Sequence, residues 1–209
     1  MTRNIIFDMG GVILPMQDIS EPIRRFRQIG MTEEMALRMF GLHGQQGIFQ
    51  DVESGKLSSE AFLKAYERLT GFRATFGDIE WAWRGFVCDP PRERLLWLGE
   101  LRQEGYHVVL LSNTNPFLMH HCDSPAFTPE GKPIAHFFDR VYYSYLLGAC
   151  KPDPRAFLRM MQEGGYKAEE CLFLDDARHN VEAAKKVGMR SLHIPNNIDW
   201  IEPLRQALP

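Results

Sequence analysis

Four short apolar runs lie along the chain, and each ends at a cluster of polar residues. The runs cover residues 4–7, 107–111, 140–143 and 171–174, and residues 191–194 form a possible fifth. Apolar runs of this length without polar alternation are typical of strands that are buried on both faces of a sheet. Between the later runs, apolar positions recur every three or four residues over 153–163 and 178–187, which predicts helices. Such an alternation of buried strands and helices predicts an α/β fold with a doubly wound parallel sheet.

The stretch from residue 16 to residue 90 breaks the alternation. It holds amphipathic helical patterns but no strand pattern, and these patterns cover residues 19–29, 32–40, 58–69 and 78–86. The run Asp89-Pro90-Pro91 then separates it from a further helical pattern over 92–104. We therefore expect a core made of residues 1–15 and 91–209, with a helical insertion of residues 16–90 after the first strand.

Composition and charge narrow the class of protein. The 209 residues are 44% hydrophobic, which is enough for a globular core. The net charge of -3 offers no basic field for nucleic acid or for an anionic membrane. The N-terminal apolar run is interrupted by Asp8 and resembles neither a signal peptide nor a membrane span. Four scattered cysteines form no CxxC pair and predict free thiols, so we expect a cytoplasmic protein.

Polar residues follow each buried run at its carboxyl end. They are Asp8, Ser112-Asn113-Thr114-Asn115, Lys151 and Asp175-Asp176. Ligands of an open parallel sheet bind outside the carboxyl ends of the strands. The sequence therefore predicts that these side chains converge on one site.

Four motifs at these positions resemble those of the haloacid dehalogenase superfamily. In chain order they are FDMGGVIL, LLSNTN, Lys151-Pro152-Asp153-Pro154 and FLDDARHN. Each is weak alone, but all four occur in the family's order and together span nearly the whole chain. The resemblance implies a Rossmann-like core that carries a hydrolase site, and it implies that residues 16–90 form a helical C1 cap over that site.

The chemistry of these residues suits phosphoryl transfer. A carboxylate such as Asp8 can attack a phosphoryl group and form an aspartyl-phosphate, and the Gly11 turn lets backbone N–H groups approach the phosphoryl oxygens. Ser112, with Asn113 beside it, can hold an anion at a strand end, although Ser112 alone would equally suit a helix N-cap. Lys151 can neutralise both the incoming phosphate and Asp8. We expect Asp8, Ser112 and Lys151 to be catalytic, and Gly11, Ser112, Asn113 and Lys151 to bind phosphate.

Asp175 and Asp176 are adjacent carboxylates at one strand end. They raise each other's pKa unless a cation is present, and Mg²⁺ is an oxygen-seeking cation suited to such a pair. The resemblance implies that Asp8, the backbone carbonyl of Gly10 and Asp176 are the Mg²⁺ ligands. Asp175 would then lie behind them or bind through water, and Asn180 would orient this group.

Gly10 departs from the family's pattern. Phosphatases of the family carry a second aspartate at this position, which protonates the leaving group and then activates water. Loss of a general acid/base typically lowers rates about 10²–10⁴-fold, so we expect weak turnover. Three interpretations remain: a Mg²⁺-dependent phosphatase of a small phosphorylated metabolite such as a sugar phosphate, a metal-independent 2-haloacid dehalogenase, or a non-catalytic module that binds a phospho-ligand. Asp175-Asp176 favours phosphate chemistry, because the dehalogenases lack this pair.

Several cap side chains are candidates to face a pocket beneath the cap. They are Arg24, Phe49, Glu53, Trp81, Trp83 and Phe86. For each, burial within the cap or exposure on its surface is the simpler expectation, since aromatic residues at helical spacing usually form core. The sequence determines neither the substrate nor the oligomeric state.

Overall fold

The computed structural model describes residues 2–40 and 45–208 and contains a five-stranded parallel sheet. The strand order is β3-β2-β1-β4-β5, and every neighbouring pair is parallel. The strands are β1 (Asn4–Phe7), β2 (His107–Ser112), β3 (Arg140–Tyr143), β4 (Cys171–Asp175) and β5 (Arg190–His193). The predicted parallel sheet is confirmed, and the possible fifth strand is its edge.

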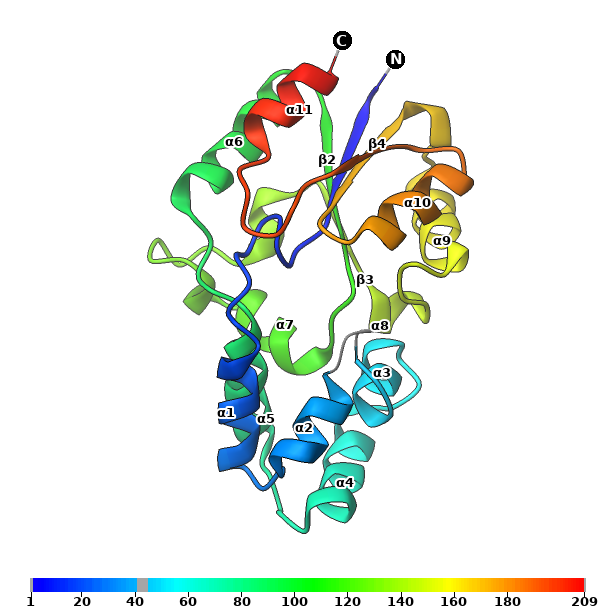
Figure 1. The fold of residues 1–209 in the computed structure, drawn as a ribbon. Coiled ribbons are helices and arrows are strands. Elements are labelled where there is room, and N and C mark those ends of the chain that lie inside the picture. The colour runs from blue at the N-terminus through cyan, green and yellow to red at the C-terminus, as the bar shows by residue number, and fades with distance from the viewer. Residues whose placement is uncertain (1, 41–44, 209) are drawn as a thin grey trace.

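Helices cover both faces of the sheet, as Figure 1 shows. On one face, Ile5 and Phe7 of β1 join the hydrophobic cluster that includes α6 (Arg92–Gln103) and α11 (Ile201–Ala207). On the other face, Ile6 joins the cluster that includes α9 (Pro154–Gly164) and α10 (Arg178–Lys186). Successive strand residues point to opposite faces, so a strand that is apolar throughout has to be covered on both sides.

The helical insertion after β1 is also confirmed. It comprises α1 (Ser20–Gln28), α2 (Glu33–Met39), α3 (Ile48–Glu53), α4 (Ser59–Thr70), α5 (Phe76–Trp83) and a 3₁₀ turn (Arg84–Phe86). Its centre is aromatic: the rings of Phe26, Phe49, Phe62 and Trp83 pack together and are almost fully buried. The side chains of Thr32, Ser58 and Thr75 cap the first turns of α2, α4 and α5.

Two linkers that run side by side join the cap to the core. The backbone N–H of Gln17 donates to the carbonyl of Phe86 at 2.9 Å, and that of Cys88 donates to the carbonyl of Pro15 at 2.7 Å. Both termini lie at the end of the sheet away from the cap, so the carboxyl ends of the strands face it (Figure 1).

Short elements complete the core. They are α7 (Pro116–Cys122), α8 (Ser144–Leu147) and 3₁₀ turns at Pro125–Phe127, Ile134–Phe137 and Ala168–Glu170. The hydrophobic pattern did not predict α3, α8 and α11, which are only four to seven residues long. In the described part of the chain, no helix has both the length and the apolar character needed to cross a bilayer.

Candidate active site

The carboxyl ends of β1 and β4 bring three carboxylates together. Asp8 follows β1, Asp175 ends β4 and Asp176 comes next, and one oxygen atom of each lies within 4.8 Å of the others. The predicted convergence therefore holds for these residues. Three carboxyl groups at this spacing are a set of hard oxygen donors of the kind that binds Mg²⁺.

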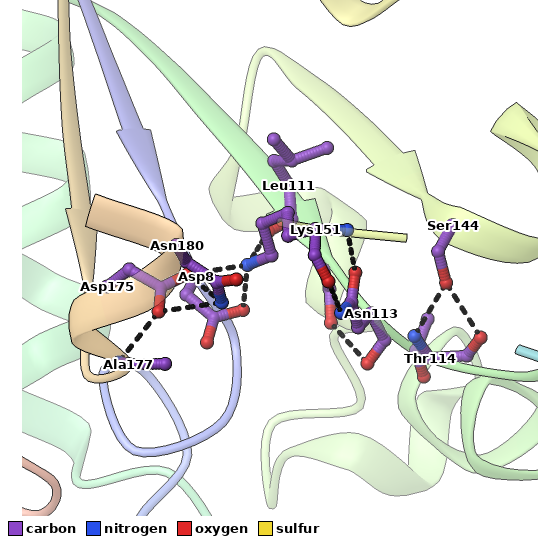
Figure 2. Close-up of polar contacts among 10 residues, drawn as sticks. Asp8, Leu111, Asn113, Thr114, Ser144, Lys151, Asp175, Ala177 and Asn180 are labelled. Atoms are coloured by element: carbon purple, nitrogen blue, oxygen red, sulfur yellow. Dashed lines mark hydrogen bonds and ion pairs between the residues drawn. The ribbon is translucent and has the colours of Figure 1, made fainter. Parts of the chain in front are cut away.

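Lys151 lies at the centre of this cluster, as Figure 2 shows. Its Nζ donates to Asp8 Oδ1 at 2.7 Å, to Asp175 Oδ2 at 2.8 Å and to the carbonyl of Leu111 at 2.8 Å. An ammonium group has three N–H donors, so all of them are used within the protein. A phosphoryl oxygen that binds Lys151 therefore has to replace one of these contacts.

Asn113 holds the backbone of Lys151 in place. Its side-chain oxygen accepts from the Lys151 N–H, and its side-chain nitrogen donates to the Lys151 carbonyl, both at 2.8 Å. This pair of hydrogen bonds ties the end of β2 to the segment that carries Lys151 (Figure 2). These two hydrogen bonds fix the position of the Lys151 backbone, from which the side chain extends to the carboxylates.

The cluster is largely withdrawn from water, and its pKa values reflect this. Burial, and secondarily the charges of Asp175 and Asp176, raise the pKa of Asp8 to about 7, although Lys151 opposes the rise. Burial alone would lower the pKa of Lys151, but the two carboxylates that it contacts raise it above its usual value. Burial and the adjacent Asp175 raise the pKa of Asp176. Three carboxyl groups share a single ammonium group here, so the site favours an added cation.

The two adjacent aspartates lie in different environments. Asp175 is fully buried, and its oxygens accept from Lys151, from the Ala177 N–H at 2.8 Å and from the Asn180 side chain at 3.0 and 3.1 Å. Asp176 is partly exposed and lines a cavity. Asn180 lines the same cavity, and its side-chain oxygen is buried without a hydrogen-bond partner among the described residues. This unpaired oxygen beside the carboxylates is a further observation that suits a cation.

The cavity has a volume of about 180 Å³ and lies between the strand ends and the cap. Asp8, Gly10, Asn113 and Lys151 line it on the core side. Of the six cap candidates, Glu53, Trp83 and Phe86 line it. Phe49 is instead buried in the cap, Trp81 is exposed, and Arg24 pairs with Glu21 at the surface.

The segment after β2 and Gln45 of the cap complete the surroundings of the cavity. Ser112 is 1% exposed, and neither it nor Gly11 lines the cavity. Thr114 and Gln45 do line it, and each has a buried side-chain oxygen without a partner in the described part of the chain. Thr114 belongs to the polar run after β2 that the sequence predicts to converge on the site, but no role is predicted for it, whereas Gln45 is not predicted as a site residue.

A larger hollow of about 350 Å³ lies beside the cap linkers and is lined by Arg25, Arg84 and His121 among others. None of the three clustered carboxylates borders it. The chemistry therefore lies in the smaller cavity.

A family model and a curated relative match most or all of this chain. A model of haloacid dehalogenase-like hydrolases matches residues 2–188. A D-ribitol-5-phosphate phosphatase of Bacteroides thetaiotaomicron is 38% identical over 208 residues, covering 100% of this chain and 99% of the relative.

Two solved structures resemble the model closely. A predicted hydrolase of this type from Porphyromonas gingivalis superposes with a TM-score of 0.91 at 36% identity, covering 99% of this chain and 98% of that one. An aspartate-to-alanine mutant of an enzyme of this family from Bacteroides thetaiotaomicron, solved in complex with magnesium and inorganic phosphate, gives a TM-score of 0.89 at 28% identity, with 98% and 100% coverage. On the match of the family model and of these relatives, the chain belongs to the haloacid dehalogenase-like hydrolases.

Proposed function

We propose that this protein is a Mg²⁺-dependent phosphatase of a small phosphorylated metabolite and that it acts through an aspartyl-phosphate on Asp8. The observation that carries the proposal is the cluster of Asp8, Asp175 and Asp176, in which Lys151 bridges Asp8 and Asp175, beside a cavity that Asp8, Lys151 and Asp176 line. The full-length relative that acts on D-ribitol 5-phosphate supports a polyol or sugar phosphate as substrate. A cavity of about 180 Å³ beneath a cap favours a small substrate over a phosphoprotein.

In this proposal, Asp8 supplies the nucleophile. Its carboxylate attacks phosphorus, and the bond between phosphorus and the ester oxygen breaks. Lys151 holds one Asp8 oxygen at 2.7 Å, which fixes the direction of the carboxylate and favours its ionised form. Asp8, the Gly10 carbonyl and Asp176 would hold Mg²⁺, which when bound neutralises charge on the phosphoryl oxygens.

Other residues keep the roles predicted for them, with two refinements. The Ser112 side chain is buried and neither Ser112 nor Gly11 lines the cavity, so the part in phosphate binding that the sequence predicts for these two residues is kept only for their backbone N–H groups, whereas Asn113 lines the cavity. Both oxygens of Asp175 are occupied by protein donors, so we assign it the positioning of Lys151. Asn180 orients Asp175, because its side-chain nitrogen donates to an Asp175 oxygen.

The division of the chain and its location are part of the same proposal. The paired linkers at residues 15–17 and 86–88 support a core of residues 1–15 and 91–209 and a cap of residues 16–90. All four cysteines are free, which supports a reducing, cytoplasmic environment.

A phosphate-release screen with Mg²⁺ tests the function. The substrates are D-ribitol 5-phosphate, other polyol and sugar phosphates, and p-nitrophenyl phosphate. Asp8→Asn is the matched control, because it keeps the shape of the side chain and removes its charge. Turnover that disappears in Asp8→Asn and in chelator supports the proposal.

Two other outcomes would replace it. Chloride release from a 2-haloacid in chelator would instead identify a dehalogenase. A rise in Tm with sugar phosphates, without turnover of any of them, would identify a binding module. Glycine at position 10 cannot donate a proton, so in this proposal another group has to protonate the leaving group.

A further inference from the structure

The space beside Gly10 is already filled by another side chain. A Cβ atom at Gly10 would lie 3.0 Å from the sulfur of Met16, which is tighter than ordinary van der Waals contact. The Met16 side chain would have to give way by a few tenths of an ångström to a side chain here, and glycine itself brings no acidic group to the cavity. A sugar or polyol leaving group is nevertheless a poor one, and it needs a proton as the ester bond breaks.

Four titratable residues are found among the described residues that line the cavity: Asp8, Glu53, Lys151 and Asp176. Asp8 is the proposed nucleophile, and Lys151 has all three N–H groups engaged with protein acceptors. Asp176 belongs to the carboxylate cluster on the strand side. Glu53 is the remaining group, and it reaches the cavity from the cap.

Glu53 is anchored to the core although it belongs to the cap. It is the last residue of α3, and its carbonyl accepts a hydrogen bond of 2.7 Å from the Ser144 hydroxyl. The same hydroxyl accepts a hydrogen bond of 3.0 Å from the N–H of Thr114, a residue just after the end of β2 (Figure 2). Two residues after Glu53, a Cβ atom at Gly55 would lie only 2.3 Å from the Tyr145 carbonyl, so this turn packs tightly on α8.

The surroundings of the Glu53 carboxyl group keep a proton on it. Burial raises its pKa to about 8, and the side chain of Asn115 opposes this rise in part. The Asn115 oxygen caps α7, while its buried nitrogen lies near Glu53 without a partner of ordinary hydrogen-bond geometry in the described chain. Cys150 is the titratable neighbour on the core side, and Lys56 lies further along the same turn. No cation pairs with Glu53 in the described structure, so the neutral acid is favoured near pH 7.

We propose that Glu53 is the proton-transfer group of this phosphatase and that it takes the place of the aspartate missing at Gly10. In the first half-reaction, Asp8 bonds to phosphorus and the ester P–O bond breaks with its electron pair on oxygen, which takes the proton from Glu53. In the second, a water oxygen bonds to phosphorus, the bond to Asp8 breaks with its electron pair on the carboxylate, and Glu53 takes the water's proton. The alcohol and phosphate leave, and both carboxyl groups return to their starting states.

The inference rests on the proposed function, and leaving-group dependence tests it. Glu53→Gln is compared with the wild type on an alkyl phosphate such as D-ribitol 5-phosphate and on p-nitrophenyl phosphate. Turnover of the alkyl phosphate should fall about 10²–10⁴-fold, since its alkoxide requires the proton. Nitrophenolate needs no proton to leave, so this substrate should give a rapid burst of about one equivalent, followed by slow release. The phosphorylated enzyme should accumulate, and acid quenching with ³²P-labelled substrate should trap it.

Controls separate this role from a structural one. Glu67→Gln changes an exposed glutamate of the same cap and should leave both rates unchanged. Unaltered Tm of Glu53→Gln establishes folding, and Glu53→Asp should recover part of the alkyl phosphate rate. Equal losses on both substrates without a burst, or full activity of Glu53→Gln, would overturn the assignment while leaving the proposed function intact. A wild-type protein that hydrolyses no phosphate ester overturns both.

Discussion

Replacement of Lys151 by methionine tests whether the charge cluster is the organising feature of the site. Methionine keeps the length of the aliphatic stem and removes the ammonium group. The Lys151 side chain is 1% exposed and contacts two carboxylates at 2.7 and 2.8 Å. Its removal leaves Asp8 and Asp175 buried without their counter-charge. Breaking a buried ion pair from one side typically destabilises a protein by about 3–5 kcal/mol.

A surface lysine provides the matched control. Lys56 lies 3.5 Å from Asp51, with side chains that are 71% and 40% exposed. Such exposed pairs contribute about 0–1 kcal/mol, so Lys56→Met should be nearly neutral. For a chain of this size, the loss expected for Lys151→Met corresponds to roughly 6–20 °C in Tm. Urea unfolding of both variants at pH 8, in chelator, measures the difference.

The pH dependence of this difference is a second check. The pKa of Asp8 is already raised to about 7, and loss of Lys151 raises it further. Between these two pKa values the folded variant keeps a proton that the folded wild type releases. The stability gap should therefore widen as pH rises through about 7 and narrow below it. Equal destabilisation by Lys151→Met and Lys56→Met, or a gap independent of pH, would refute the reasoning.

Two further perturbations probe the contact between cap and core and the gap beside Gly10. Ser144→Ala removes the hydroxyl that anchors Glu53, and it should lower the free energy of unfolding by about 1–3 kcal/mol and also lower alkyl phosphatase activity. The control Ser191→Ala removes a hydrogen bond of 2.9 Å elsewhere in the core and should lower stability alone. Unfolding and turnover are measured in parallel for both variants. Gly10→Asp should not rescue the Glu53→Gln enzyme by itself, because Met16 fills the space, but the same change combined with Met16→Ala should restore part of the turnover. Rescue by Gly10→Asp alone would show that Met16 moves aside freely.

The strand-end part of the site could be predicted from the sequence because geometry leaves little choice. Parallel strands present their carboxyl ends at one edge, so Asp8 and Asp175 had to meet once their strands were recognised. The direction in which the chain leaves a strand is not determined by strand periodicity. Ser112, the last residue of β2, is buried away from the cavity, whereas Thr114, two residues later, lines it.

The cap side of the site could not be predicted in the same way. Ser144 and Glu53 are separated by 91 positions, and their hydrogen bond depends on how the cap packs on the core. The segment around Glu53 carries no motif for proton transfer, and its helix is only six residues long. The sequence shows the departure at Gly10, but strand and helix periodicity do not show which cap side chain lies opposite it.

The location of the proton donor has a consequence for how the reaction is controlled. An acid two residues after the nucleophile is fixed to the core and stays in place whatever the cap does. Glu53 reaches the cavity only while the turn after α3 is seated on α8 and on the Ser144 hydroxyl. Proton transfer then depends on cap seating, and an alkyl phosphate can be cleaved only when the cavity is closed to water. In Ser144→Ala the loss of activity should therefore be larger for D-ribitol 5-phosphate than for p-nitrophenyl phosphate in the burst phase, because only the first needs the proton to leave.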